Sequence, residues 1–175
     1  MLLTFKSEWT LWYDKTDLNI CNDNWDQFLI EIQNIQTFEN FWRLFNNAPI
    51  LSDLPIGSNY HFFKKGIEPK WEDSENIGGG KWVLCVPRTG NLEFEKIWEI
   101  SLLAMISNRF TSLGNQAING LVASVRKHEV RFSIWTKQAH DKNLQIEIGK
   151  FWKKIIEEEV ENTKSSFEFY SHSIN

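Results

Sequence analysis

The spacing of apolar residues along the chain changes several times, and each change marks a different predicted element. Residues 8–15, EWTLWYDK, alternate between apolar and polar, which predicts a strand with Trp9 on one face and Trp12 on the other. From Thr37 the spacing becomes helical, because apolar residues then recur at i, i+3, i+4 and i+7. Threonine is favoured immediately before a helix, so we expect the first helix to begin there.

The same two periods continue to the end of the chain. Strands are predicted at 60–63 and 81–86, on either side of a polar loop whose glycines would let the chain turn back. Further helices are predicted at 92–110, which we expect to be the longest, and at 144–160. The remaining strands are a β-hairpin over 121–135 and a last strand over 166–172.

These elements predict an α+β fold in which helices cover one face of a mostly antiparallel sheet, because the links between strands are of hairpin length. A chain of 175 residues is expected to form a single domain over residues 1–175. We find no internal repeat or linker. No apolar run predicts a signal peptide or a membrane span, so no membrane partner is expected.

Composition narrows the kind of ligand. Nine tryptophans and thirteen phenylalanines exceed what a core of this size needs. A net charge of -4 argues against broad binding to phosphate backbones, which depends on a basic surface. Cys21 and Cys85 form no CxxC pair and lie far from any histidine at ligand spacing, so we expect no disulfide, metal or other cofactor and a reducing compartment.

Two tryptophans occur in polar segments, where a folding argument would not place them: Trp71 in PKWEDSEN and Trp25 in CNDNWDQF. Each is either partly buried under a neighbouring loop or a platform for a flat ligand. Stacking of a base on an aromatic ring contributes roughly 1–3 kcal/mol, and a cation–π contact about 2 kcal/mol when desolvated. Glu72 is either a solvated carboxylate or an acceptor for two donors on one planar edge, such as that of guanine.

The hairpin contributes two cations. If its turn is centred between His128 and Glu129, Arg126 lies directly opposite Arg131. Facing like charges are destabilising by up to about 1 kcal/mol, and an anion between them would reverse the sign. Arg131 and Trp135 share one face of the second strand. Two arginines splayed into solvent remain the alternative.

Together these residues describe a flat, cationic guanine held by two indoles, with a short phosphate chain running to two arginines. In order and spacing, the segments EWTLWYDK, GIEPKWEDSENIGGGKW, KIWEISLLAMI, VRKHEVRFSIW and IGKFWKKI resemble the translation initiation factor 4E family, the mRNA 5′ cap-binding proteins. The resemblance runs from Trp9 to His172. It implies a curved antiparallel sheet of about eight strands backed by three helices on its convex face, with the cap slot on the concave face.

The resemblance also implies roles for single residues. Trp25 and Trp71 would sandwich the 7-methylguanine, Glu72 would accept from its N1–H and 2-amino group, and Trp135 would contact the N7-methyl group. The cap phosphates would be held by Arg126 and Arg131, with Lys81 assisting through water. Capped mRNA is therefore the expected nucleic-acid partner of a protein that acts as a monomer in the cytoplasm and, in part, the nucleus.

A second surface follows from the same resemblance. Trp42 matches the residue that receives the Tyr-x-x-x-x-Leu-Φ helix of the scaffold initiation factor 4G and of competing 4E-binding repressor proteins. The same dorsal groove would be lined by Phe38, Glu39, Leu102 and Leu103, although core packing is an alternative for Trp42. Glu99-Ile100 replaces the usual Leu-Glu, and the family's His-Pro pair is missing, so the dorsal partner is less determined than the cap.

Several residues depart from the family pattern near the phosphates. His128 stands where a lysine is usual, and Asn59 and Ser124 replace an Asp and an Asn. We therefore expect weaker or more pH-dependent phosphate binding. The sequence ends at Asn175, so contacts from the family's C-terminal loop are expected to be missing or reduced.

The same residues distinguish between alternative functions. An initiation factor, which binds the cap and recruits a scaffold to start translation, is favoured over a cap-binding repressor because Trp9 and Trp25 are both kept. A tryptophan-platform carbohydrate-binding module or a glycosidase would not require Arg126 and Arg131. No HExxH, GxSxG, Walker A or Cys/His arrangement is present, so we expect no catalysis.

Overall fold

The computed structural model describes residues 4–15, 28–88, 93–113, 117–160 and 166–172, so Trp25 and Cys21 lie outside the described residues. The strands are β1 (Thr4–Lys15), β2 (Ile30–Thr37), β3 (Ser58–Lys64), β4 (Gly80–Pro87), β5 (Ile118–Val125), β6 (Glu129–Thr136) and β7 (Ser166–Ser171). The α-helices are α1 (Phe38–Asn47), α2 (Phe94–Ile106) and α3 (Lys142–Glu159), and two short 3-10 helices are η2 (Leu51–Asp53) and η3 (Arg109–Leu113).

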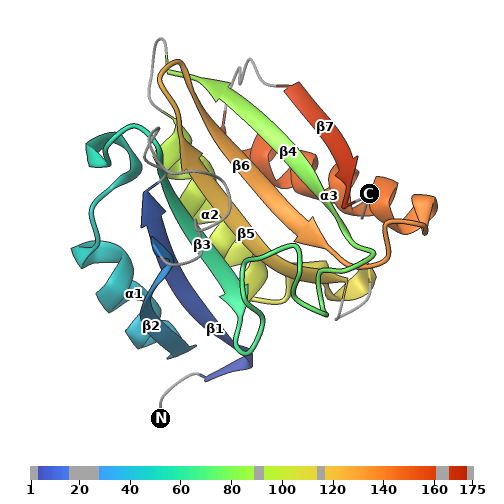
Figure 1. Ribbon diagram of the computed structural model, residues 1–175, viewed down its shortest axis with the longest axis horizontal. Coiled ribbons are helices and arrows are strands. Elements are labelled where there is room, and N and C mark those ends of the chain that lie inside the picture. Colours follow the sequence, from blue (N-terminus) through green and yellow to red (C-terminus); the bar gives the residue numbers. More distant parts are fainter. Residues whose placement is uncertain (1–3, 16–27, 89–92, 114–116, 161–165, 173–175) are drawn as a thin grey trace.

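The strands form one curved sheet in the order β2-β1-β3-β5-β6-β4-β7, and every neighbouring pair is antiparallel. The three α-helices lie behind one face of this sheet (Figure 1). The predicted α+β class and helix-covered antiparallel sheet are confirmed. The described residues form seven strands, whereas about eight were expected.

Two further expectations need correction. Helix α2, with 13 residues, is shorter than α3, with 18, so the prediction that it is the longest is wrong. It stops early because Asn108 adopts a left-handed conformation, with φ of 55°, that breaks the helical path. Strand β2 was not predicted because its apolar residues do not mark one buried face: Ile30 and Ile32 are exposed, and its pairing with β1 shifts register near Trp12.

Helix α2 is the centre of the core. Nine of its residues are buried, which is why its sequence is apolar on nearly every side rather than along one stripe. It packs beside α3, where the fully buried Trp152 donates from Nε1 to the hydroxyl of Ser101 at 2.9 Å. On the sheet, Trp9 stacks on Phe62 with ring centroids 4.9 Å apart.

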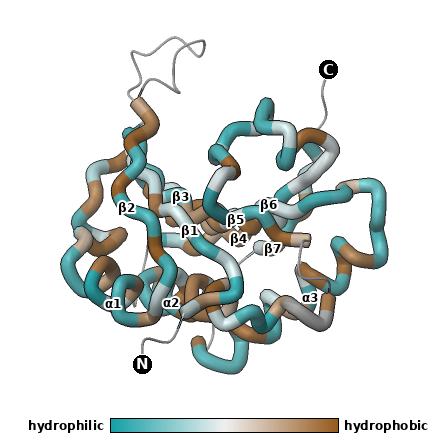
Figure 2. Tube along the Cα trace, turned by 90° about the horizontal axis from the view of Figure 1, so that it is seen from below, coloured by the Kyte–Doolittle hydropathy of each residue, from teal (hydrophilic) through white to brown (hydrophobic). Residues whose placement is uncertain are grey.

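The opposite face of the sheet carries polar and aromatic side chains in rows across the strands. One row places Asp14, Asn59, Ser124, Arg131 and Cys85 side by side, from β1 through β3, β5 and β6 to β4. Figure 2 shows the helices on one side of the sheet and loops rising on the other. We call this helix-free side the concave face, and it carries the candidate site.

A second row crosses the same strands nearer the other end of the sheet, through Thr10, Phe63, Gly120, Trp135 and Lys81. A Cβ atom on Gly120 would lie 2.5 Å from the ring of Phe63, so glycine is required for that ring to lie across β5. The ring of Phe63 in turn meets Trp135 edge to face at 5.5 Å. The two rows mark the two ends of the concave face.

Candidate functional site

Trp71 lies on the loop between β3 and β4 and is 55% exposed, more than any other large apolar side chain of this loop. Its neighbour Glu72 is exposed as well. The sequence prediction that Trp71 is not part of the core is therefore confirmed. The indole and the carboxylate are both accessible to a ligand.

The loop is held from inside by a buried amide that the sequence analysis missed. Asn76 is 1% exposed, and its Nδ2 donates to the carbonyl oxygens of Glu68 and Lys70, at 3.0 and 2.6 Å. Its Oδ1 accepts from Nδ2 of the buried Asn119 on β5, at 2.9 Å. These bonds tie Asn76, which follows Trp71 in the chain, to the backbone that precedes Trp71, so the backbone of the loop is held in place around the indole.

An apolar contact fixes the start of the same loop. Ile67 is buried and packs with Phe63 and Val122 of the concave face, and Trp135 borders this small cluster. Further along, Asp73 accepts from the backbone N–H groups of Glu68 and Glu75, each at 2.9 Å. The exposed Trp71 thus belongs to an ordered loop rather than to a loose one.

Lys81 and Trp135 face each other across β4 and β6 beneath this loop. The Nζ of Lys81 lies 5.9 Å from the Trp135 ring centroid, within range of a cation–π contact. Burial, assisted by the nearby charge of Arg131, lowers the pKa of Lys81. The ring of His172 packs on that of Trp135 with centroids 4.4 Å apart, and burial lowers the pKa of His172. We call Trp71, Glu72, Lys81 and Trp135 the loop end of the concave face.

The hairpin places the two arginines at the other end, but not in the predicted register. Ser124, not Arg126, pairs with Arg131, and the backbone N–H of Arg126 donates to Glu129 at 2.9 Å. The prediction that Arg126 lies directly opposite Arg131 is wrong because the turn is centred between Lys127 and His128. Because side chains alternate between the two faces of a strand, a shift of two residues leaves both arginines on one face, where they are diagonal neighbours. We call Arg126 and Arg131 the hairpin end.

The arginines differ in environment. Arg131 is exposed and pairs with the carboxylate of Glu129, and this pairing raises the pKa of Arg131. Arg126 is partly buried, and burial together with the charge of Arg131 lowers its pKa. An acidic side chain therefore already balances Arg131, while Arg126 is the more desolvated cation. An anion placed here would interact more strongly with Arg126 than with a fully solvated cation.

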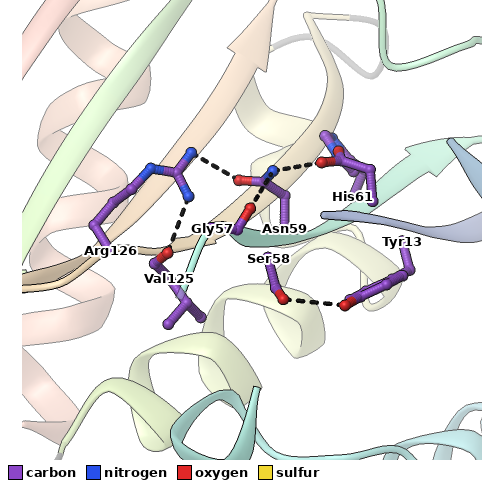
Figure 3. Close-up of polar contacts among 8 residues, drawn as sticks. Tyr13, Gly57, Ser58, Asn59, His61, Val125 and Arg126 are labelled. Atoms are coloured by element: carbon purple, nitrogen blue, oxygen red, sulfur yellow. Dashed lines mark hydrogen bonds and ion pairs between the residues drawn. The ribbon is translucent and has the colours of Figure 1, made fainter. Parts of the chain in front are cut away.

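Beside Arg126 lies a buried polar chain that sequence reasoning also missed. Nη2 of Arg126 donates to Oδ1 of Asn59 at 2.9 Å, and Nδ2 of Asn59 donates to Oδ1 of Asp14 at 2.7 Å. The other oxygen of Asp14 lies 2.5 Å from Nε2 of His61. Figure 3 shows Arg126, Asn59 and His61 in this arrangement. The alternation of β1 placed Asp14 on the face of Trp12, which was the available signal.

The two ends are close enough for one small ligand to reach both. Arg131 and Trp135 lie on the same face of β6 and, at about 3.3 Å a residue, are roughly 13 Å apart along the strand. The loop end offers a flat aromatic surface, a cation and a carboxylate, and the hairpin end offers two guanidinium groups. This combination suits a planar base joined to a short chain of phosphates.

The second predicted surface lies on the helix side. Trp42 on α1 is 37% exposed and meets the rings of Phe41 and Phe45 edge-on, so it lies at the surface rather than in the core. Glu39 is exposed and pairs with Arg43 at 3.0 Å. The other three predicted residues are half-buried or buried: Phe38, Leu103 and Leu102.

Leu102 differs from the other predicted residues of this surface because it is buried. It is only 3% exposed and lines a small apolar pocket between α1 and α2, together with Leu44, Phe45 and Trp98. Leu102 therefore belongs to the packed interior beneath α1 rather than to an exposed groove. Leu103, its half-buried neighbour, is better placed to meet a partner.

Within the described ranges, no group of three or more His, Cys, Asp or Glu side chains is arranged to hold a metal ion. In the same part of the chain, no helix is long and apolar enough to span a membrane.

Comparison with known families matches residues 4–175 to the family described as eukaryotic initiation factor 4E. The chain is 37% identical over 165 residues to eukaryotic translation initiation factor isoform 4E of Nicotiana tabacum, covering 94% of this chain and 78% of the relative. It is 35% identical over 168 residues to eukaryotic translation initiation factor 4E of Candida albicans, covering 95% and 78%.

Solved structures with the same fold include Ascaris suum eIF4E-3 in complex with m7G cap, with a TM-score of 0.87, 30% identity, and coverage of 100% of this chain and 94% of that chain. The complex of C. elegans eIF4E-3 with the 4E-binding protein Mextli and a cap analog has a TM-score of 0.83 and 30% identity, and covers 96% and 92%. At these identities the likeness extends to the family and not to the fold alone.

Proposed function

This chain belongs to the eukaryotic initiation factor 4E family, and on that basis we propose that it binds the 7-methylguanosine cap of mRNA in cytoplasmic translation initiation. The family consists of cap-binding factors and not of enzymes, in agreement with the prediction of no catalysis. Two related structures were solved with caps, m7G and m2,2,7G, which supports the same ligand class for this chain.

The observation that carries the proposal is the exposed indole of Trp71 on a loop fixed by Asn76. The backbone of an ordered loop does not have to be ordered again when its indole stacks on a base, so more of the stacking energy appears as affinity. The methylated guanine carries a positive charge, which adds a cation–π contribution of about 2 kcal/mol when desolvated. In the proposed arrangement Trp71 stacks on one side of the ring, and Trp25, outside the described residues, on the other.

The neighbouring groups would supply selectivity. We assign Glu72 to accept from the N1–H and 2-amino group of guanine, because an ionised carboxylate can only accept hydrogen bonds. The backbone N–H of Trp71 would donate to O6. Trp135 would contact the N7-methyl group, and the phosphate chain would run towards Arg126 and Arg131, with Lys81 beside it.

We also propose that the chain recruits a scaffold protein and so starts cap-dependent translation. The supporting observation is Trp42, which is 37% exposed on α1 and packs edge-on against Phe41 and Phe45. A related protein, C. elegans eIF4E-3, was solved in complex with the 4E-binding protein Mextli. A helix of the Tyr-x-x-x-x-Leu-Φ type would lay its apolar side over Trp42 and Leu103, with Phe38 and Glu39 at the border.

The test of cap binding is quenching of intrinsic tryptophan fluorescence by 7-methyl-GTP, with GTP titrated at the same salt concentration. Strong quenching by the methylated nucleotide alone is the expected result. Equal quenching by both nucleotides, or none, would overturn the proposed ligand. Scaffold recruitment is tested separately by calorimetry with a Tyr-x-x-x-x-Leu-Φ peptide, comparing the wild type with Trp42→Ala.

A further inference from the structure

We propose that Asp14 is a positioning residue for the phosphates of the ligand: held by His61, it orients Arg126 through the side-chain amide of Asn59. The inference rests on the proposed function, since it concerns how the hairpin end holds phosphate. It concerns three residues of β1 and β3: Asn59 stood out in the sequence as a departure near the phosphates, whereas Asp14 and His61 were not expected to take part in binding.

The chain of hydrogen bonds has only one possible polarity at Asn59. A guanidinium can only donate and an ionised carboxylate can only accept. The amide must therefore turn its oxygen to Arg126, at 2.9 Å, and its nitrogen to Asp14, at 2.7 Å. Because Asp14 fixes which way the amide faces, it also fixes the acceptor that Arg126 meets.

The hydrogen bond at the other end of this series, between His61 and Asp14, is equally constrained. His61 and Asp14 are buried, with 9% and 6% of their side chains exposed. Among the described residues Nδ1 of His61 has no hydrogen-bond partner, whereas Nε2 lies 2.5 Å from Asp14. We therefore assign a ring proton to Nε2, since it has an acceptor there. The imidazole thus holds the second carboxylate oxygen and keeps Asp14 in place.

This arrangement orients the guanidinium for a ligand. Two N–H groups of Arg126 donate to protein oxygens in the described part of the chain, Oδ1 of Asn59 and the carbonyl of Val125 at 3.0 Å. Figure 3 shows both bonds fixing the plane of the group. A guanidinium has further donors in the same plane, which suits a phosphate oxygen pair. Fixing the plane beforehand lowers the cost of ordering it on binding.

The same geometry explains a departure from the family pattern. An aspartate at position 59 would place its carboxylate against that of Asp14, and two adjacent carboxylates do not both ionise readily. This protein instead has a neutral amide at Asn59 on β3, and its carboxylate lies on the neighbouring strand β1, at Asp14. The negative charge near Arg126 is thus moved rather than lost.

The decisive variants are Asp14→Asn and the double variant Asp14→Asn with Asn59→Asp, which moves the carboxylate to β3. The matched control is Glu129→Gln, which removes a carboxylate beside Arg131 outside the chain of bonds. Three probes are titrated, 7-methyl-GTP, 7-methylguanosine and inorganic tripolyphosphate, and melting temperatures show that each variant is folded. If net charge alone mattered, both single variants would bind phosphate more tightly.

We expect Asp14→Asn to weaken binding of 7-methyl-GTP and tripolyphosphate roughly tenfold, because a neutral amide, which both donates and accepts, replaces the charged acceptor that fixes how Asn59 faces, and to leave 7-methylguanosine unchanged. Glu129→Gln should bind phosphate as well as or better than the wild type, and the double variant should recover most of the loss. Unchanged or tighter tripolyphosphate binding by Asp14→Asn, no rescue, or no tripolyphosphate binding by the wild type would overturn the inference. If instead the wild type fails to prefer 7-methyl-GTP over GTP, the proposed function fails while the tripolyphosphate comparison still decides the role of Asp14.

Discussion

The loop end of the concave face is held by neutral amides, whereas the hairpin end is held by a buried charge. At the loop end, Asn76 and Asn119 bind backbone carbonyls and each other, and the ligand-facing Trp71 stays 55% exposed. At the hairpin end, Asn59 links Asp14 to Arg126, which is itself partly buried. One end fixes a backbone and the other fixes a side chain.

The difference matches the two parts of the proposed ligand. A base is recognised by a flat surface and an edge, so the loop must hold one indole and one carboxylate in place, and small shifts of the backbone would misplace both. Phosphates are recognised mainly by charge, so the hairpin end needs a guanidinium whose plane is set and whose charge is only partly solvated. We therefore expect changes at the loop end to act whatever the number of phosphates, and changes at the hairpin end to act only when phosphates are present.

The largest effect is expected from Trp71→Ala. Removing one stacking partner and its cation–π contribution should weaken cap binding by about 3 kcal/mol, or roughly a hundredfold. The loss should be the same for 7-methylguanosine and for 7-methyl-GTP, measured by calorimetry. Because the side chain is exposed, the melting temperature should not change. Trp71→Phe is the control and should retain part of the affinity, and equal binding by the alanine variant would contradict the role of Trp71.

A somewhat smaller effect is expected from Glu72→Gln. The amide has one acceptor and one donor group where the carboxylate has two acceptors, so one bond to the guanine edge is replaced by a repulsive pair of donors. Affinity for 7-methyl-GTP should fall by roughly 2 kcal/mol, as for a bond to a charged group. Stacking should survive, so selectivity for guanine over adenine caps should fall more than fluorescence quenching does. Glu75→Gln, another loop carboxylate, serves as the control, and undiminished guanine selectivity in Glu72→Gln would count against this assignment.

Next in size is Asn76→Ala, which acts on the loop without touching the ligand. It removes one hydrogen bond each from the carbonyls of Glu68 and Lys70 and from the amide of Asn119, at a cost of about 2 kcal/mol in the free energy of unfolding. A looser loop should weaken 7-methylguanosine and 7-methyl-GTP equally, by about 1 kcal/mol. Denaturant unfolding and calorimetry measure the two effects. A loss confined to 7-methyl-GTP would show that the ends are not independent.

How much the sequence predicts also differs between the two ends. Trp71 and Glu72 could be assigned because their neighbours in the chain are polar, so local context alone set them apart from the core. The helices and most strands followed from periodicity for the same local reason. Strand β2 did not, because as an edge strand it leaves Ile30 and Ile32 exposed and so gives no one-sided pattern.

The hairpin end depends on pairing between distant strands, which no local pattern contains. The centre of the hairpin turn was predicted one residue too far along the chain, which shifts every pair by two residues, because the residues of the turn, Lys127 and His128, do not fix its centre. The bond between Asp14 and His61 joins residues on β1 and β3, and it depends on the register of those strands rather than on either segment alone. A buried polar chain of this kind becomes visible only when the register is known.

The smallest effect is expected from Lys81, and it depends on pH. Burial and the charge of Arg131 lower the pKa of Lys81, so its ammonium group loses its proton at a lower pH than an ordinary lysine does. Any contribution of this charge to phosphate binding is complete below that lowered pKa and disappears as the pH rises through it. In Lys81→Arg the charge persists, because a guanidinium does not deprotonate in this range.

The affinities of Lys81→Arg and wild type for 7-methyl-GTP should therefore be similar at neutral pH and diverge as the pH rises, with the variant tighter by roughly threefold, the scale of a solvated ion pair. Titration of the ligand itself affects both proteins alike and cancels in the ratio. The same series with 7-methylguanosine should show no divergence, since that ligand has no phosphate. Divergence with both ligands would mean that Lys81 acts on the base through Trp135, and would move it from the phosphate path to the recognition of the ring.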